Sequence, residues 1–330
     1  MKVAVAFGGS VSPDFKSWYA KGKEKYLFNG DTLHTVYNPI FNYSFFWENG
    51  CFLNLQEWED ELPDLDLDVI IYANERHGLD PSNWDKYSVA RLKNKYPKVK
   101  VVGFLKELTV PPHRYKNWIK FLNDCDFVVG ACTGIIQELS EYKELQLLLN
   151  KKINFFSSPH DIEYVYDNFY SEVKDNAIFA YLPNPMHRRG KTLEFTEYIG
   201  KKYDIPVVKK PFTDGSNDAI HMSWTDFVNL WSPCLWHFNL DPTELQQGQH
   251  VVAVANVGSI NFGGMNESHK LLFPETATCD LNVLEEKFVE YLESPEKRFE
   301  AITYAWNKLN ELYGMDVVKK QLLEMLSNKK

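Results

Sequence analysis

Short apolar runs alternate with amphipathic stretches along the first half of the chain. Residues 3–7 (VAVAF) form the first run and lead directly into Gly8-Gly9-Ser10, the pattern of a buried parallel strand followed by a tight turn. Further runs of this kind predict strands at residues 69–72, 99–104, 127–130 and 153–156. Helical patterns lie between them, at residues 87–96, 115–123 and 135–149. Strands that alternate with helices predict right-handed crossovers and a mostly parallel sheet.

The same alternation returns in the second half, after a polar and aromatic stretch at residues 157–176. Strands are predicted at residues 178–183, 205–208 and 234–238, and helices at residues 192–203, 224–230, 248–257 and 284–292. The valines of residues 248–257 would also suit a strand. A long amphipathic helical region from Pro295 to about Ser327 closes this half. We therefore predict an α/β protein of two Rossmann-like domains, residues 1–172 and residues 173–330.

One stretch of the first half departs from this alternation. Residues 25–55 are rich in Phe, Tyr, Asn and Trp and show only weak periodicity, so we predict an irregular or hairpin-bearing insertion. Its rings would either pack in the core or line an acceptor pocket.

Size and charge narrow the class of protein. The chain has 330 residues, more than the ~250 that usually share one core, which agrees with two domains. Hydrophobic residues make up 44% of the chain and charged residues 25%, so each half has enough apolar material for a core. The net charge of −9 argues against a broad basic surface that binds nucleic acid or anionic membrane.

The cysteines and the N-terminus indicate a cytoplasmic protein. The five cysteines are odd in number and show no metal-binding spacing, so we expect reduced thiols. The apolar run at residues 3–7 is too short for a signal peptide. No stretch approaches the ~18 apolar residues of a membrane span.

A basic turn follows the first predicted strand of the second half. It carries a histidine and three fixed cations directly before a predicted helix, at His187, Arg188, Arg189 and Lys191. Arginine, lysine and the N–H groups of a helix N-terminus suit a diphosphate, and ligands bind at the carboxyl ends of parallel strands. A solvated basic loop would also account for these residues.

Two glycine-containing segments add candidate donor contacts. Gly248 and Gln249 enter a predicted helix, where a glycine allows phosphate to approach, while Glu244 and Gln249 suit hydrogen bonds to sugar hydroxyls. Helix capping or core packing is the alternative for this segment.

The second segment is Asn261 to His269 (NFGGMNESH). Gly263 and Gly264 predict a tight turn, and Glu267 has two oxygens that can accept hydrogen bonds from ribose or hexose hydroxyls. Turn formation alone would also explain the two glycines.

These three segments, in this order and followed by LFPET and a closing helix, resemble the donor-binding domain of GT-B glycosyltransferases. Arg188, Arg189 and Lys191 resemble the basic diphosphate-binding positions, and residues 248–258 stand where that family carries its E-x-x-G, E-A-x-A-x-G region. The resemblance covers roughly residues 176–330. One departure is Val252, which stands where the second glutamate of the E-x₇-E motif would follow Glu244.

The resemblance implies two Rossmann-like domains that face each other across a cleft. It further implies a hexosyl- or pentosyltransferase that moves sugar from a nucleotide sugar, expected to be a UDP-sugar, to an acceptor hydroxyl. Such an enzyme needs no cofactor beyond the donor substrate and no metal. The acidic repeat at residues 64–68 (DLDLD) precedes a strand instead of following one, so we do not predict a metal site there.

An inverting transferase also needs a base for the acceptor hydroxyl. Candidates follow predicted strands of the first half, with Glu75 and His77 ranked before Asp14. We expect a glycan or small-molecule acceptor before DNA, because the chain is acidic. A GT-B-shaped nucleotide-sugar epimerase and a non-catalytic sugar- or nucleotide-binding protein are the alternatives. A nicotinamide dehydrogenase is disfavoured, because Gly8-Gly9-Ser10 does not fit G-x-G-x-x-G.

Overall fold

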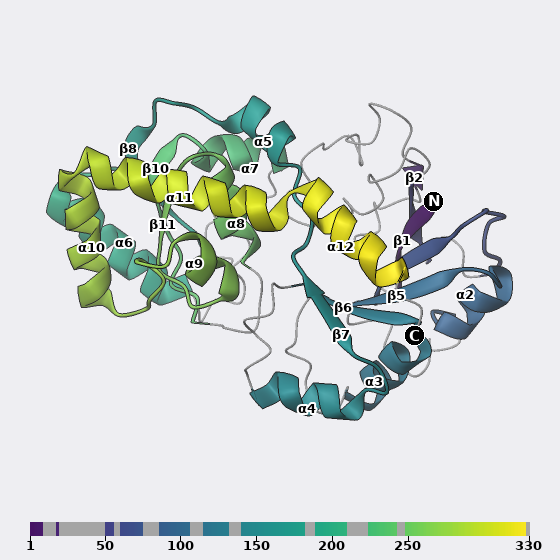
Figure 1. Ribbon diagram of the computed structural model, residues 1–330. Helices are drawn as coiled ribbons and strands as arrows, with labels where there is room; N and C mark the ends of the chain where they lie inside the picture. Colours follow the sequence, from purple (N-terminus) through teal and green to yellow (C-terminus); the bar gives the residue numbers. More distant parts are fainter. Residues whose placement is uncertain are drawn as a thin grey trace. The chain divides into compact units, whose positions relative to one another are not determined.

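The computed structural model divides the chain into two compact units (Figure 1). Unit 1 contains Met1–His160 and Met315–Lys330, and unit 2 contains Asp161–Gly314. The structure describes residues 1–8, 18–19, 50–55, 60–74, 86–105, 115–131, 140–181, 189–209, 224–242 and 248–327. No helix in these ranges is long and apolar enough to cross a membrane.

The described residues of unit 1 form a seven-stranded sheet in the order β2-β3-β1-β4-β5-β6-β7. The strands are β1 (Val3–Gly8), β2 (Trp18–Tyr19), β3 (Cys51–Asn54), β4 (Val69–Asn74), β5 (Lys100–Leu105), β6 (Phe127–Ala131) and β7 (Ile153–Phe156). All pairings are parallel except that of β2 with β3. The five predicted strands of the first half are therefore confirmed.

Strand β3 lies in the stretch where an irregular or hairpin-bearing insertion was predicted. It pairs with one side of β1 while β4 pairs with the other, so Ala4 aligns with both Cys51 and Ile70. Its four residues, CFLN, are too few to show a period within a stretch rich in aromatic residues. Its place beside β1 makes β1 an interior strand, which explains why Val3 to Ala6 are fully buried.

The helices of unit 1 are α2 (Val89–Lys95), α3 (Tyr115–Asp124), α4 (Ser140–Leu148) and α12 (Met315–Ser327). Helix α2 begins after Ser88, whose side chain accepts a hydrogen bond from the backbone of Arg91 at 3.1 Å. Helices α2, α3 and α4 match the helices predicted at residues 87–96, 115–123 and 135–149, and their described ends agree within a few residues.

Helix α12 belongs to unit 1, although it was predicted to close the second domain. Its buried side chains repeat at helical spacing and join the cluster formed by the sheet of unit 1, at Val318, Leu322, Met325 and Leu326. Lys100 of β5 also donates a hydrogen bond from Nζ to the backbone oxygen of Leu326 at 2.8 Å. An amphipathic pattern predicts a buried face but does not say which sheet that face covers.

The chain enters unit 2 earlier than the predicted boundary at residues 172 and 173. Helix α5 (Ile162–Phe169) forms where only a polar and aromatic stretch was recognised, and Asp161 caps it by accepting from the backbone of Tyr164 at 3.1 Å. The ring of Tyr170 then lies against Gly258, because a Cβ atom at Gly258 would come within 2.6 Å of its Cε2. These contacts attach residues 161–172 to unit 2.

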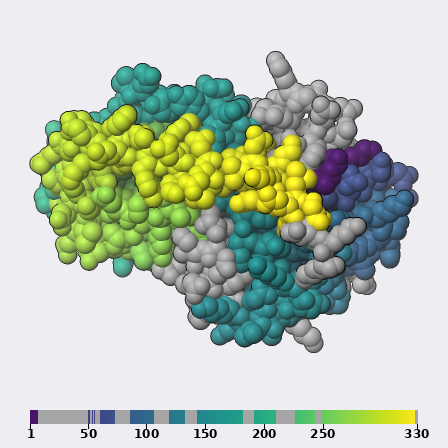
Figure 2. Space-filling model, in the orientation of Figure 1, coloured from purple at the N-terminus to yellow at the C-terminus, as the bar shows by residue number. Residues whose placement is uncertain are grey.

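The sheet of unit 2 has four parallel strands in the described residues, in the order β11-β10-β8-β9. They are β8 (Asp175–Ala180), β9 (Val207–Lys209), β10 (Cys234–Phe238) and β11 (Ile260–Phe262). The helices are α6 (Arg189–Tyr203), α7 (Trp224–Trp231), α8 (Gln249–Asn256), α9 (Glu267–Leu272), α10 (Leu281–Glu293) and α11 (Pro295–Tyr313). Figure 2 shows α10 and α11 at the surface of unit 2, in yellow-green and yellow.

Much of the high aromatic content lies in the core of unit 2. Trp236 and Phe288 are fully buried, and the rings of Phe238 and Phe262 stack across neighbouring strands at 5.2 Å. Helix α8 lies inside this core, since every residue from His250 to Asn256 is buried. This burial on all sides explains why its valines would also have suited a strand.

Candidate functional site

Polar residues gather at the carboxyl ends of three strands of unit 2. Tyr181 follows β8, Asn239 and Asp241 follow β10, and the pair Gly263-Gly264 follows β11. These strands are parallel neighbours, so their carboxyl ends meet at one edge of the sheet. Open parallel sheets bind their ligands at this edge. We call these residues, with the first turns of α6, α8 and α9, the candidate donor site.

The ring of Tyr181 stacks on His250, which lies in the first turn of α8. The ring centroids are 4.0 Å apart and the planes differ by 8°. Burial, and then the charge of Asp241, raise the pKa of Tyr181 to about 12. Burial lowers the pKa of His250 well below its ordinary value, with the neighbouring His237 and His269 acting in the same direction. Near neutral pH the phenol therefore keeps its proton and the imidazole is uncharged.

The N-terminus of α8 begins at Gly248, as the sequence predicted. A Cβ atom at this position would lie 2.6 Å from Oδ1 and 2.7 Å from Nδ2 of Asn266. Only glycine therefore allows Asn266 to approach so closely. Gln249, the first residue of the helix, is half-buried. The N–H groups of a first helical turn suit an anionic group such as phosphate.

Gly263 and Gly264 form the predicted tight turn. Their φ angles are +91° and +86°, in the left-handed region that favours glycine. The backbone N–H of Gly263 donates to the backbone oxygen of Thr276 at 2.9 Å. The backbone N–H of Met265 donates to the backbone oxygen of Asp241 at 3.1 Å. The turn after β11 is thus joined to the end of β10.

Helix α9 starts directly after this turn. Asn266 caps it by accepting from the backbone N–H of His269 at 3.2 Å. Glu267 is its first residue and is only 2% exposed. The side chain predicted to accept hydrogen bonds from sugar hydroxyls is therefore a buried carboxylate in this structure. The hydroxyl groups of Ser268 and Tyr313 lie 3.0 Å apart and connect α9 to α11.

The first turn of α6 lies at the same edge. Arg189 begins the helix, and Lys191 is exposed. Thr192 is fully buried, and its Oγ1 accepts a hydrogen bond from the backbone N–H of Leu240 at 3.1 Å. Burial raises the pKa of the half-buried Cys279, and a hydrogen bond from the backbone of Gly264 lowers it by a smaller amount. Lys191 directly precedes Thr192, whose hydrogen bond joins the first turn of α6 to the segment after β10.

The remaining predicted residues lie outside the described ranges. They are Asp14, Glu75, His77, His187, Arg188 and Glu244. Their roles stay predictions. The side chain of Arg189 is likewise outside the described set.

Sequence reasoning missed several residues that the structure places in the candidate donor site. These are Tyr181, Thr192, Asn239, Asp241, His250, Asn266 and His269. Tyr181, Asn239 and Asp241 directly follow strands, and the other four lie in or just before first helical turns. Their position relative to the strands was the available signal, since the residue types alone resemble ordinary loop and cap residues.

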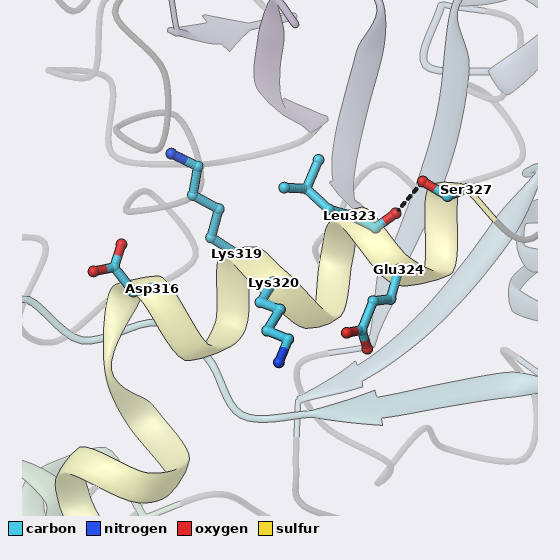
Figure 3. A pocket seen from close by; sticks show the side chains of 6 residues that line it. All are labelled: Asp316, Lys319, Lys320, Leu323, Glu324 and Ser327. Carbon is cyan, nitrogen blue, oxygen red and sulfur yellow. Dashed lines mark hydrogen bonds between the residues drawn. The ribbon is translucent and has the colours of Figure 1, made fainter.

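Two hollows in the described surface are lined by other residues. One lies along α12, and the described residues that line it, Asp316, Lys319, Lys320 and Glu324 among them, all belong to that helix (Figure 3). The other, of about 700 Å³, lies beside α10 and α11 in unit 2. Within it Lys287 pairs with Glu275 at 3.2 Å and with Glu290 at 2.8 Å. Among the described residues, no group of three or more His, Cys, Asp or Glu side chains is placed to hold a metal ion.

No protein-family model matches the sequence, and a search of curated proteins finds no match. Solved structures match over nearly the whole chain. An alpha-glucosyltransferase (AGT) in complex with UDP has a TM-score of 0.65 at 10% identity, covering 99% of this chain and 100% of its own. An alpha-glucosyltransferase in complex with UDP-glucose and DNA containing an abasic site has a TM-score of 0.63 at 10% identity, covering 99% of each chain.

A third match is Anabaena Alr3699/HepE in complex with UDP-glucose, with a TM-score of 0.58 at 10% identity, covering 98% of this chain and 99% of its own. The chain therefore shares the fold of these solved structures, two of which are alpha-glucosyltransferases, and the predicted GT-B fold class is confirmed. The likeness extends over both units, including unit 1, for which the sequence offered only its alternation of strands and helices.

Proposed function

We propose that this chain is a glycosyltransferase that moves a sugar from a UDP-sugar, with UDP-glucose as the first donor to test, to an acceptor hydroxyl. The observation that carries the proposal is the likeness over nearly the whole chain to structures of glycosyltransferases that hold UDP or UDP-glucose. The candidate donor site supports it, because its helix N-termini and paired glycines suit a diphosphate joined to a sugar.

The diphosphate would bind between two helix N-termini. Gly248 leaves the first turn of α8 without a side chain at its cap, and Asn266 lies close beside it. Arg188, Arg189 and Lys191, at and just before the start of α6, would add their charges. As the bond from sugar to phosphate breaks, negative charge builds on the leaving diphosphate, and fixed cations and N–H groups stabilise that charge. This chemistry needs no metal, and we propose a metal-independent reaction.

The sugar would then contact the turn after β11. Gly263 and Gly264 allow close approach of the backbone, and the carboxylate of Glu267 would accept from hydroxyl groups of the donor. Unit 1 would bind the acceptor, with Glu75, His77 or Asp14 as the base if the reaction inverts configuration. A retaining reaction would instead rely on the donor phosphate to accept the proton of the acceptor.

We propose a glycan or a small molecule as the acceptor and the cytoplasm as the location. The net charge of −9 disfavours a polyanion. DNA stays the second choice, because one of the alpha-glucosyltransferase structures holds DNA. Retention on DNA that weakens as salt concentration rises would favour this second choice.

Calorimetric titration with UDP and UDP-glucose, with and without EDTA, tests the donor site. Gly248→Ala should weaken UDP binding at least tenfold, because the new Cβ atom displaces Asn266. The matched control is Gly200→Ala in α6, where a Cβ atom would lie 2.5 Å from Cγ2 of Val207 and away from the candidate donor site. Absence of UDP binding to the wild type, or equal losses in both variants, would refute the proposed donor site.

Product analysis then separates the candidate functions. Release of UDP with transfer of sugar to an acceptor or to water indicates a glycosyltransferase. An isomerised nucleotide sugar with no UDP released would indicate the epimerase instead. Binding of UDP-glucose without turnover in the presence of a broad acceptor panel would favour the non-catalytic binding protein.

A further inference from the structure

The turn after β11 is enclosed on two sides. A Cβ atom on Gly263 would lie 2.6 Å from Cδ2 of Leu240 and 2.7 Å from the backbone oxygen of Asn239. A Cβ atom on Gly264 would lie 2.5 Å from Cε1 and 2.6 Å from Cδ2 of His269. The end of β10 therefore packs against the first glycine, and an imidazole ring packs against the second.

The imidazole of His269 is itself held in place. It is fully buried, and its backbone N–H is bound by the cap residue Asn266. Its Nε2 lies 3.4 Å from Nδ2 of Asn239, an amide nitrogen that can only donate, so Nε2 accepts and the ring proton is on Nδ1. Burial lowers the pKa of His269 to about 3, against a smaller opposing effect of Asp241. The ring is therefore neutral near pH 7.

This arrangement leaves buried polar atoms without partners. Among the described residues, neither Oδ1 of Asn239 nor Nδ1 of His269 has a hydrogen-bond partner. Unsatisfied buried polar atoms destabilise a fold, so apolar residues here would give a more stable core. Asn239 and His269 therefore do something that packing alone does not require, and they do it at the carboxyl edge of the sheet.

We propose that His269 is a positioning residue whose buried imidazole, oriented by Asn239, holds the Gly263-Gly264 turn in the conformation that receives the donor. The turn is joined to the end of β10 by the hydrogen bond from Met265 to Asp241. Asn266, which caps α9 at His269, also lies against Gly248 at the N-terminus of α8. The statement that the turn receives the donor rests on the proposed function. The contact by which His269 holds the turn, which we call the clamp, does not rest on it.

Hydrogen exchange at the backbone amide of Met265 tests the clamp without any ligand. In His269→Ala this amide should exchange at least ~10-fold faster than in the wild type, which corresponds to a loss of ~1.4 kcal/mol of local protection. The control is Ile199→Ala, which also removes a fully buried side chain from unit 2 but lies near the far end of α6. It should leave the exchange of Met265 unchanged. Unchanged exchange in His269→Ala would overturn the proposal.

A double-mutant cycle tests the contact of the ring with Gly264. Gly264→Ala strains the backbone in any background, but it meets the imidazole only where His269 is present. Its effect on Met265 exchange should therefore be several-fold smaller in the His269→Ala background than in the wild type. Equal effects in the two backgrounds would show that the ring does not clamp the turn.

Titration with UDP-glucose tests whether the clamp serves the donor. His269→Ala should raise the dissociation constant at least ~10-fold, whereas His269→Gln, which retains an acceptor for Asn239, should recover part of the loss. Faster exchange at Met265 with an unchanged dissociation constant would overturn the role in donor binding. Failure of the wild type to bind any UDP-sugar would refute the proposed function, while the exchange measurements would still decide whether His269 clamps the turn.

Discussion

Nδ1 of His237 lies 3.3 Å from Nε2 of His250, with both imidazoles buried in the core of unit 2. Two protonated rings cannot share this contact, since each nitrogen would then carry a hydrogen. Burial lowers the pKa of His237 to about 3 and that of His250 well below its ordinary value. The pair is therefore neutral in the folded protein at physiological pH, and the ring of His250 stacks on Tyr181 at the candidate donor site.

The first prediction is a loss of stability in mild acid. A histidine with a folded pKa near 3 and an unfolded pKa near ~6.5 binds fewer protons when folded, so its contribution is complete above pH ~6.5 and declines as pH falls towards 3. Each such histidine should lower the free energy of unfolding by about 1.4 kcal/mol per pH unit in this window. Denaturation of the wild type and of His237→Gln from pH 7.5 to 5.0 checks this. The slope should be smaller in the variant, and equal slopes would contradict the prediction.

The second prediction concerns the unit to which α12 belongs. Leu322 is fully buried in the core cluster of unit 1, so Leu322→Ala should lower the free energy of unfolding by about 2–5 kcal/mol. The adjacent Leu323 is 38% exposed, and Leu323→Ala should change it by less than ~0.5 kcal/mol. Hydrogen exchange read separately in each unit assigns the loss. Faster exchange in the sheet of unit 2, with unit 1 unaffected, would restore α12 to the second domain.

The fold was predictable where strands are buried on both faces. The runs VAVAF and VIIY are continuously apolar, and CLWHF is interrupted only by a histidine, because both faces of these strands are buried. Each run forms a strand. The position of the short strand β3 was not predicted, because four residues within an aromatic-rich stretch show no period. Helix α12 was correctly predicted as helical but placed in the wrong domain, since its partner cluster is formed by residues some 150 or more positions away.

The sequence predicted the glycines of the candidate donor site and some residues of its first helical turns, such as Gln249 and Glu267. Gly248, Gly263 and Gly264 were recognised as glycines at turns and helix starts, and each lies where a Cβ atom would collide with a neighbour. Asn239 and His269 were not recognised, because their contact spans residues from two different elements. A buried polar pair of this kind has no local spacing that a single sequence reveals.

The third prediction tests the hydrogen bond that fixes α6 at the candidate donor site. Thr192→Val keeps the shape of the side chain but leaves the buried N–H of Leu240 without its acceptor, so the free energy of unfolding should fall by about 1–3 kcal/mol. UDP binding should also weaken, because the first turn of α6 is no longer tied to the end of β10. Thr192→Ser retains the hydroxyl and should keep UDP affinity close to the wild type. Calorimetry and denaturation of both variants check this, and equal UDP affinities in the two would remove α6 from the site.

The last prediction addresses the basic turn before α6. UDP should raise the melting temperature of the wild type, since a ligand that binds only the folded state stabilises it by mass action. The double variant Arg188→Ala with Arg189→Ala should lose most of this shift, because two fixed cations no longer face the diphosphate. A control that replaces the exposed Lys201 and Lys320 by Ala removes the same charge from elsewhere and should keep the shift. Loss in both variants would mean that net charge alone attracts UDP, and retention in both would exclude the arginine pair from the donor site.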